Sequence, residues 1–357
     1  MNHRGTHLQK RFGLAAAVAV TSAVLVSAAT VSPYATAASA ASTATGHARS
    51  KPVVTHVRTV ASFDFAVGDA PENVTLSPDG SLTVSMLGGS AGRRPALVRV
   101  DASGHHREVL VAGQPGDMIT GNTRGHDGSV YYNVSSADAA RSGVWKLPLG
   151  GSPRRIAALP AGELPNGLAI DPAGRTLYLA ESFKGAVWTV PVSGGTATPW
   201  LTDASLTPDQ AAPLPLGANG LRFHNGAVWV SNFSKGTLLR VPVTATGSAG
   251  RVHVVADSVV GIDDFNFLSG RSDVVFAALN SLDEIAVIYP NGAKRTVLTR
   301  ADGLASPTAT VVRGQRLYIT DGGFAESRDA KLQQGKINFS ALFGDGGGDG
   351  GGDGATA

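Results

Sequence analysis

Four side chains that carry oxygen recur at one place in a repeated sequence pattern. Six segments begin with a polar or small residue, continue as an alternating strand, turn at a glycine and return as a second apolar strand. The first residues of these segments are Glu72, Thr120, Asn166, Asn219, Asp263 and Pro307. Two carboxylates and two carboxamides, without His or Cys, are typical ligands of a hard cation. Ca²⁺ fits best because it accepts irregular oxygen geometry, and another divalent cation is the alternative.

The elements that must position these residues follow from their spacing. The six segments start 48, 46, 53, 44 and 44 residues apart, close to the length of a four-stranded antiparallel sheet with its turns. Third strands follow at 185–195 and 236–247. We therefore predict an all-β fold, a six-bladed β-propeller over residues 53–340, with a seven-bladed ring as the alternative. The stretch 53–67 would supply the missing outer strand of the last blade and close the ring.

The innermost strands of a propeller surround its central channel, so the first residues of the six segments should share one axis. The predicted metal ligands are Glu72, Asn166, Asn219 and Asp263. Asn followed by Gly, at 166–167 and 219–220, is also common turn chemistry. A purely structural role for either pair therefore stays open at this point.

Two adjacent carboxylates, Asp263 and Asp264, compete for the channel position. Phe265 lies two residues after Asp263, as Leu221 lies two after Asn219, so the shared pattern makes Asp263 the ligand. Strand alternation would then turn Asp264 toward contacts behind the ion. Phe265 is expected beside Asp264, and Thr120 along the channel. A register shifted by one residue would make Asp264 the ligand instead.

The motifs around these residues resemble those of a known family. "PEN" (71–73), "LPNGLAIDP" (164–172), "GANGL" (217–221) and "IDDF" (262–265) are similar to motifs of the senescence marker protein/gluconolactonase/LRE-like six-bladed propellers. Lactonases and diisopropyl-fluorophosphatases are relatives of that family. The resemblance covers about residues 55–325. It implies a catalytic calcium held by Glu72, Asn166, Asn219 and Asp263, with Asp263 as general base or nucleophile.

The resemblance implies a calcium-dependent hydrolase that acts on a small lactone or ester, with Ca²⁺ as the Lewis acid. Sugar-lactone members carry Arg two residues before the first Asn and Asp directly after it. Leu164 and Gly167 occupy those places here, which does not favour gluconolactone as substrate. Two alternatives stay open. One is a non-catalytic secreted propeller that uses calcium structurally and binds a partner, and the other is a strictosidine synthase-like lyase or condensing enzyme, which the segment 164–182 also resembles.

The ends of the chain differ in composition from the repeats. Residues 1–37 are typical of a Sec-type signal peptide, 38–52 of a disordered linker, and 341–357 of a disordered Gly/Asp tail. We therefore predict a secreted protein without a membrane span after processing, and a monomer.

Charge and cysteine content narrow the partners. The leader holds three of the 30 basic residues and no acid, so the remaining 27 bases balance the 27 acids. A neutral chain does not favour nucleic acid as a partner. The absence of cysteine from the sequence excludes disulfides and thiolate metal sites.

Two further features carry weaker expectations. Each of the histidines His105, His106, His126 and His224 is expected in a solvated connection or turn. The long stretch 202–219 runs into Asn219 and is expected either as part of a lid or as a plain surface loop.

Overall fold

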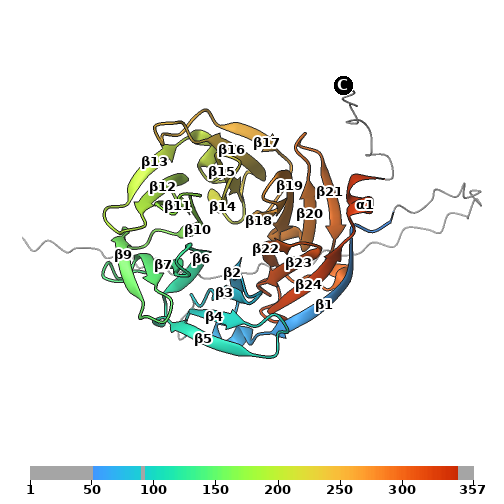
Figure 1. The fold of residues 1–357 in the computed structure, drawn as a ribbon, viewed down its shortest axis with the longest axis horizontal. Helices are drawn as coiled ribbons and strands as arrows, with labels where there is room; N and C mark the ends of the chain where they lie inside the picture. Colours follow the sequence, from blue (N-terminus) through green and yellow to red (C-terminus); the bar gives the residue numbers. More distant parts are fainter. Residues whose placement is uncertain (1–50, 90–92, 345–357) are drawn as a thin grey trace, which may run out of the picture. The chain divides into compact units, whose positions relative to one another are not determined.

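A computed structural model describes residues 51–89 and 93–344 of the chain. Within them, six four-stranded antiparallel sheets are arranged as the blades of a ring (Figure 1). The predicted six-bladed β-propeller is confirmed, and the seven-bladed alternative is wrong. The predicted leader and almost all of the predicted linker lie outside the described residues.

Each blade is ordered from the channel outwards, and blades 1 to 6 follow the chain. The innermost strands are β2 (Pro71–Leu76), β6 (Met118–Arg124), β10 (Pro165–Ile170), β14 (Ala218–His224), β18 (Ile262–Ser269) and β22 (Pro307–Arg313). The second strands are β3 (Leu82–Met86), β7 (Val130–Ser135), β11 (Thr176–Glu181), β15 (Ala227–Asn232), β19 (Ser272–Leu279) and β23 (Arg316–Asp321). The third strands are β4 (Ala96–Val100), β8 (Gly143–Leu147), β12 (Ala186–Pro191), β16 (Thr237–Pro242), β20 (Glu284–Ile288) and β24 (Lys331–Ile337). The outer strands are β5 (Arg107–Ala112), β9 (Arg154–Ala158), β13 (Thr198–Thr202), β17 (His253–Ala256), β21 (Lys294–Leu298) and β1 (Val54–Ser62).

The sixth blade combines the two ends of the domain. Its outer strand, β1, pairs antiparallel with β24, from Val54 opposite Ile337 to Ser62 opposite Lys331. The stretch 53–67 therefore supplies the closing strand, as predicted. Because this pairing joins the first strand to the last, the ring cannot open without the loss of a whole strand's hydrogen bonds.

The apolar core lies between neighbouring blades. Each of the six interfaces between successive blades has its own cluster of buried apolar side chains. Between blades 5 and 6, for example, Phe276, Ile285, Leu317 and Ile319 are fully buried. Strand alternation produces this arrangement, since one face of each sheet meets the preceding blade and the other face meets the following one. The core therefore holds the blades together around a channel.

Tight glycine turns join the strands as the repeat predicts. Between β14 and β15, Asn225 and Gly226 both have positive φ, 45° and 68°. This is the backbone of a two-residue hairpin turn, which favours Asn-Gly because neither residue resists the left-handed region strongly. Short 3₁₀ turns occur at η1 (Phe65–Val67), η2 (Ala204–Leu206), η3 (Asn280–Leu282) and η4 (Arg300–Asp302).

One short helix, α1 (Phe339–Phe343), follows the last strand. The side chain of Asn338 caps its start by accepting from the backbone N–H of Ala341. Ala341 and Leu342 are buried in the cluster between blades 5 and 6. The packed domain thus continues beyond residue 340, where the Gly/Asp tail is expected to begin, because Leu342 has an apolar environment. Residues 345–357 lie outside the described chain, and no described helix is long and apolar enough to cross a membrane.

Candidate functional site

Every innermost strand has an irregular register at or beside the first residue of its repeat. In β18, Ile262 pairs with Leu279 and Phe265 with Ala277, so Asp263 and Asp264 together lie opposite the single residue Ala278. This is the pattern of a β-bulge, which places one extra residue in a strand and redirects its side chains. Simple alternation therefore does not decide how Asp263 and Asp264 are oriented.

Blades 3 and 4 carry the Asn-Gly pairs at the same bulge. Neither Gly167 nor Gly220 has a positive φ, so these pairs are parts of strands and not turns. A Cβ on Gly167 would lie 2.4 Å from the backbone nitrogen of Leu221 and 2.5 Å from the carbonyl oxygen of Asn219. Glycine is required there because the next blade's inner strand approaches so closely. The turn interpretation of Asn-Gly is replaced by a packing reason for the glycine, which leaves the Asn side chain to be explained separately.

Polar side chains opposite two bulges hold the neighbouring inner strand in place. The hydroxyl of Ser231 on β15 accepts from the N–H of Gly220 at 2.7 Å and donates to the carbonyl oxygen of Asp263 at 2.5 Å. On β7, Asn133 Nδ2 donates to the carbonyl oxygen of Asn166 at 2.7 Å. The backbones of Asp263 and Asn166 are thus fixed by the preceding blade.

The four predicted ligands are all buried but keep a small exposed fraction. The exposed fractions are 9% for Glu72, 7% for Asn166, 2% for Asn219 and 6% for Asp263. Two of these residues act on the ionisation of Asp263, since the charge of Glu72 raises its pKa and a hydrogen bond from Asn219 lowers it. The structure therefore brings Glu72, Asn219 and Asp263 close together. Asn166 lies at the equivalent bulge of β10.

Burial dominates the electrostatics of the carboxylates. Burial, followed by the charges of Glu72 and Asp264, raises the pKa of Asp263 well above its usual value. Burial, followed by the charge of Asp264, raises the pKa of Glu72 to about 7. Burial also raises the pKa of Asp264, although Arg222 opposes this effect. Carboxylates that repel one another in a buried site gain most from a bound cation.

Two buried amide oxygens next to these carboxylates, those of Asn73 and Asn219, have no hydrogen-bond partner among the described residues. Among the described residues, no hydrogen-bond donor reaches the buried Oδ1 of Asn219, although its side chain donates to Asp263. Buried polar atoms are normally satisfied, so an orphaned acceptor beside carboxylates suits a cation. The donor chemistry of the predicted set thus fits Ca²⁺. No group of three or more His, Asp and Glu side chains in the described chain is arranged to hold a metal ion, so such a site would depend on the two asparagines.

The remaining predicted residues have structural contacts. Thr120 is buried and its hydroxyl donates to the carbonyl oxygen of Pro165 at 2.6 Å, which ties blade 2 to blade 3. Phe265 is fully buried in the apolar cluster between blades 4 and 5, and only its N–H reaches Asp264, at 2.7 Å from Oδ1. Phe265 therefore packs in the core beside the channel residues.

Two residues that sequence reasoning missed contact Asp264. Asn73 Nδ2 lies 2.5 Å and Arg222 Nη2 lies 2.6 Å from Asp264 Oδ2. Asp264 thus contacts side chains of two other inner strands, and because it lies in a bulge, simple alternation does not explain these contacts. The available signal was Arg222 itself, a charged residue at a strand position where the third repeat has Ala169.

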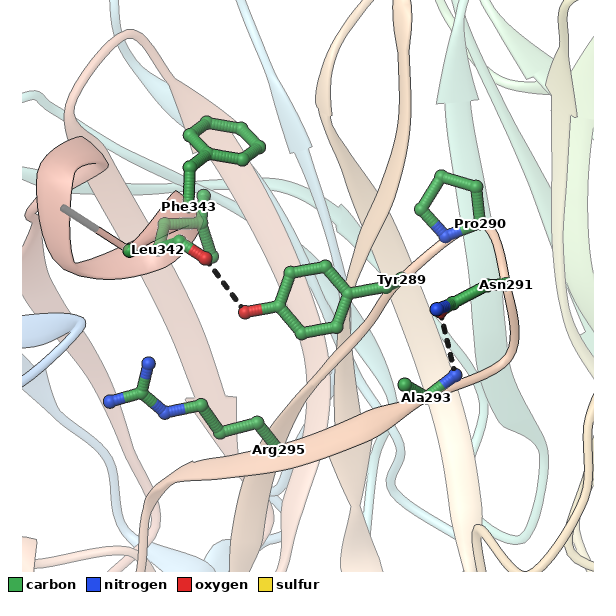
Figure 2. Close-up of a pocket in the computed structure, with 8 residues that line it drawn as sticks. Tyr289, Pro290, Asn291, Ala293, Arg295, Leu342 and Phe343 are labelled. Carbon is green, nitrogen blue, oxygen red and sulfur yellow. Dashed lines mark hydrogen bonds between the residues drawn. The ribbon is translucent and has the colours of Figure 1, made fainter. Parts of the chain in front are cut away.

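Four surface cavities can be compared with the positions of the predicted ligands. A cavity of about 580 Å³ lies between the β20–β21 turn and α1, where the hydroxyl of Tyr289 donates to the carbonyl oxygen of Leu342 (Figure 2). Further cavities of about 380, 380 and 160 Å³ are lined by loop and outer residues. None of these four cavities is lined by a predicted ligand.

The histidines differ from one another. His105, His106 and His126 are exposed, as expected. The expectation of a solvated turn is wrong for His224, which is buried and stacks on Phe267 with ring centroids 3.6 Å apart. Its Nε2 lies 3.0 Å from Asp273 Oδ1. The partners come from the next blade, so the turn sequence around His224 did not reveal them.

The long connection between blades 3 and 4 is fixed in its first half. Leu206 in η2 is fully buried, and Asn232 Nδ2 donates to the carbonyl oxygens of Ser205 at 2.8 Å and Thr207 at 2.9 Å. The side chain of Leu214, in the second half, is about half exposed. A lid role therefore remains a prediction only for the second half of this connection.

Comparisons with known proteins agree on the fold. No protein family and no curated protein matches the chain by sequence. A gluconolactonase from Xanthomonas campestris resembles it with a TM-score of 0.59 at 14% identity, over 80% of this chain and 95% of that one. Virginiamycin B lyase from Staphylococcus aureus gives 0.53 at 13%, over 79% and 99%. An auxiliary nutrient binding protein from Bacteroides ovatus gives 0.60 at 12%, over 76% and 70%.

These neighbours include enzymes and a binding protein. At such low identities the likeness establishes a six-bladed propeller, distantly similar in structure to gluconolactonases and virginiamycin B lyase, and no more. A fold of this kind supports many functions, so function has to be argued from the residues of the channel.

Proposed function

We propose that the chain is a secreted, monomeric, calcium-dependent hydrolase of the gluconolactonase-like kind that opens a small lactone or cleaves an ester. The observation that supports this most is the buried group of Glu72, Asp263 and Asn219, in which burial raises the pKa of both carboxyl groups, the charge of Glu72 raises that of Asp263 further, and an amide oxygen lacks a donor. The motifs shared with that family and the distant structural likeness to a gluconolactonase agree with it. Export would use the Sec-type leader.

The four predicted ligands would have different roles in binding and catalysis. Glu72 and Asp263 would hold the ion through carboxylate oxygens, and Asn166 and Asn219 through amide oxygens. The chemistry that calcium supplies in such a site is polarisation of the substrate carbonyl. Asp263 takes the proton of the attacking water on a carboxylate oxygen that is free to accept it. Because a cation lowers the pKa of a carboxylate that it binds, this role requires an oxygen of Asp263 that the ion holds loosely or not at all.

A direct attack by Asp263 on the carbonyl carbon is the variant of this mechanism. It would form a mixed anhydride between Asp263 and the acyl group as the ester C–O bond breaks. The alkoxide leaves as an alcohol, which stays attached to the acyl group in a lactone, and water then hydrolyses the anhydride. Mass spectrometry of an acid-quenched reaction distinguishes the two routes, since only direct attack adds the acyl mass to the protein.

Replacement of Asp263 by Asn tests the assignment. We expect calcium-dependent turnover in a panel of lactones and aryl esters, and a loss of at least about 100-fold in kcat/KM in Asp263→Asn, because the amide cannot accept the proton. Asp273→Asn is the matched control, since Asp273 lies on the same blade and contacts His224 instead of the channel group. Full activity of Asp263→Asn on a substrate that the wild type hydrolyses would overturn the assignment.

A non-catalytic propeller with structural calcium is the second candidate. It is favoured by the position of the four cavities, none of which is lined by a predicted ligand. Calcium would then raise the melting temperature without turnover of any panel member. A lyase or condensing enzyme, the further alternative, is recognised by products to which no water has been added.

A further inference from the structure

The carboxylate of Asp264 joins three blades at one point. Its Oδ2 accepts from Asn73 Nδ2 at 2.5 Å and from Arg222 Nη2 at 2.6 Å, and its Oδ1 accepts from the N–H of Phe265 at 2.7 Å. Asn73 belongs to blade 1, Arg222 to blade 4 and Asp264 to blade 5. Blade 6 lies between blades 5 and 1 along the ring, so the contact between Asn73 and Asp264 links blades that are not neighbours (Figure 1).

The neighbouring blade provides the space for this carboxylate. A Cβ on Gly220 would lie 2.6 Å from Asp264 Oδ1 and 2.7 Å from its Cα. Any side chain at residue 220 would therefore displace Asp264. The glycine of the fourth repeat and the acid of the fifth are complementary in shape.

The pair is also matched in charge. The side chains of Arg222 and Asp264 are exposed by only 14% and 4%. An unpaired charge so deeply buried is costly, and the arginine offsets that cost through a direct ion pair. Arg222 is also fixed by its own backbone contact, since its Nη1 donates to the carbonyl oxygen of Leu221 at 2.9 Å.

Each member of this group lies one to three residues after a predicted ligand on the same inner strand. Asn73 comes after Glu72, Asp264 after Asp263, and Arg222 lies three residues after Asn219. Both carboxylate oxygens of Asp264 are already occupied by donors. Asp264 is therefore suited to hold the strands that carry the predicted ligands in place.

We propose that Asp264, held by Arg222 and Asn73, is a positioning residue that locks blades 1, 4 and 5 at the separation that Glu72, Asn219 and Asp263 need to share one divalent cation. This inference rests on the cation site of the proposed function, but not on hydrolysis. Its consequence is that removal of any of the three contacts weakens calcium binding while the four ligands remain intact.

Calcium titration calorimetry on the mature chain tests the inference. We expect Asp264→Asn, Arg222→Met and Asn73→Ala to raise the Kd for Ca²⁺ by about 10- to 100-fold, the usual effect of the loss of a residue that orients metal ligands. The arginine variant is the most informative. If Arg222 acted only through its charge, its removal would tighten the binding of a cation, whereas loss of positioning weakens it.

Arg141→Met is the matched control. Arg141 pairs with the buried Asp117 in blade 2 and with Asp138, and neither pair includes a predicted ligand, so its loss removes an ion pair to a buried aspartate and should leave the Kd unchanged. Asn73→Ala keeps the ion pair of Arg222 with Asp264, so it provides a folded variant if either charge substitution fails to fold. Wild-type Kd in Asn73→Ala and tighter binding in Arg222→Met would overturn the positioning role alone. Absence of calcium binding by the wild type would overturn it together with the cation site, and binding without turnover would overturn only the hydrolase.

Discussion

The inner strands of blades 4 and 5 carry the same bulge but fill it differently. In β14 the bulge holds Asn219 and Gly220, and in β18 it holds Asp263 and Asp264. The first residue of each pair is a predicted ligand. The second residue is Gly220 in blade 4, which has no side chain, and Asp264 in blade 5, whose carboxylate is buried and ion-paired.

The difference shows that the inner strands of blades 4 and 5 are complementary in shape and charge. Gly220 leaves the space that the Asp264 carboxylate occupies, and Arg222 from the same strand supplies the opposite charge. A ring of six copies of the Asn-Gly form would lack both features. Asp264, which stands where the third and fourth repeats have Gly, is thus matched to residues of β14. Substitutions in β14 should therefore disturb β18, and substitutions in β18 should disturb β14.

The largest loss of stability is expected when residue 220 gains a methyl group. Gly220→Ala places a Cβ 2.6 Å from both the carbonyl oxygen of Asp263 and Oδ1 of Asp264. We expect the free energy of unfolding to fall by about 1–3 kcal/mol, since overpacking of this kind forces the strands apart. Urea denaturation measures it.

Gly270→Ala is the control for that variant. A Cβ on Gly270 meets no atom within 4 Å, and its φ is not positive. Its stability should be unchanged or slightly higher. If Gly220→Ala were as stable as the control, Asp264 would be free to move away from β14, and the complementarity of the two strands would be refuted.

A smaller effect, on the pH dependence of stability, is expected at the opposite end of β14 and β18. There His224 of β14 stacks on Phe267 of β18. Burial, opposed by Asp273, lowers the pKa of His224 below 6.5. The unfolded chain therefore binds more protons than the folded one as pH falls below 6.5, so this histidine contributes stability above that pH which is lost on acidification.

His224→Gln removes the titrating group but keeps a side-chain N–H that can donate to Asp273. The free energy of unfolding should then fall less between pH 7 and pH 5 than in the wild type. Identical profiles for His224→Gln and the wild type would show that the far ends of the strands do not respond to pH.

The repeat predicts most of the fold because each blade is a local unit. Glycine turns, alternating apolar residues and the spacing of the six segments each depend on residues close in sequence, and the closing strand 53–67 was the only one left for the sixth blade. The sequence does not show the bulges, since an extra residue in a strand becomes visible only against its partner strand.

The contacts of the site are harder to predict because they join distant residues. Asn73 and Asp264 are 191 positions apart, and Arg222 and Asp264 are 42 apart. Position in the repeat selects Glu72, Asn219 and Asp263, but only the ring brings Asn73 across to blade 5. The burial of His224 was missed for the same reason, since Phe267 and Asp273 belong to the next blade.

Calcium binding by the purified mature chain tests the central claim most directly. Titration calorimetry should show one Ca²⁺ per chain, with binding lost or weakened at least about 100-fold in Asp263→Asn and unaffected in Asp273→Asn. A wild-type chain that binds no divalent cation, or an Asp263→Asn variant that binds as tightly as the wild type, would contradict a cation site formed by Glu72, Asn166, Asn219 and Asp263.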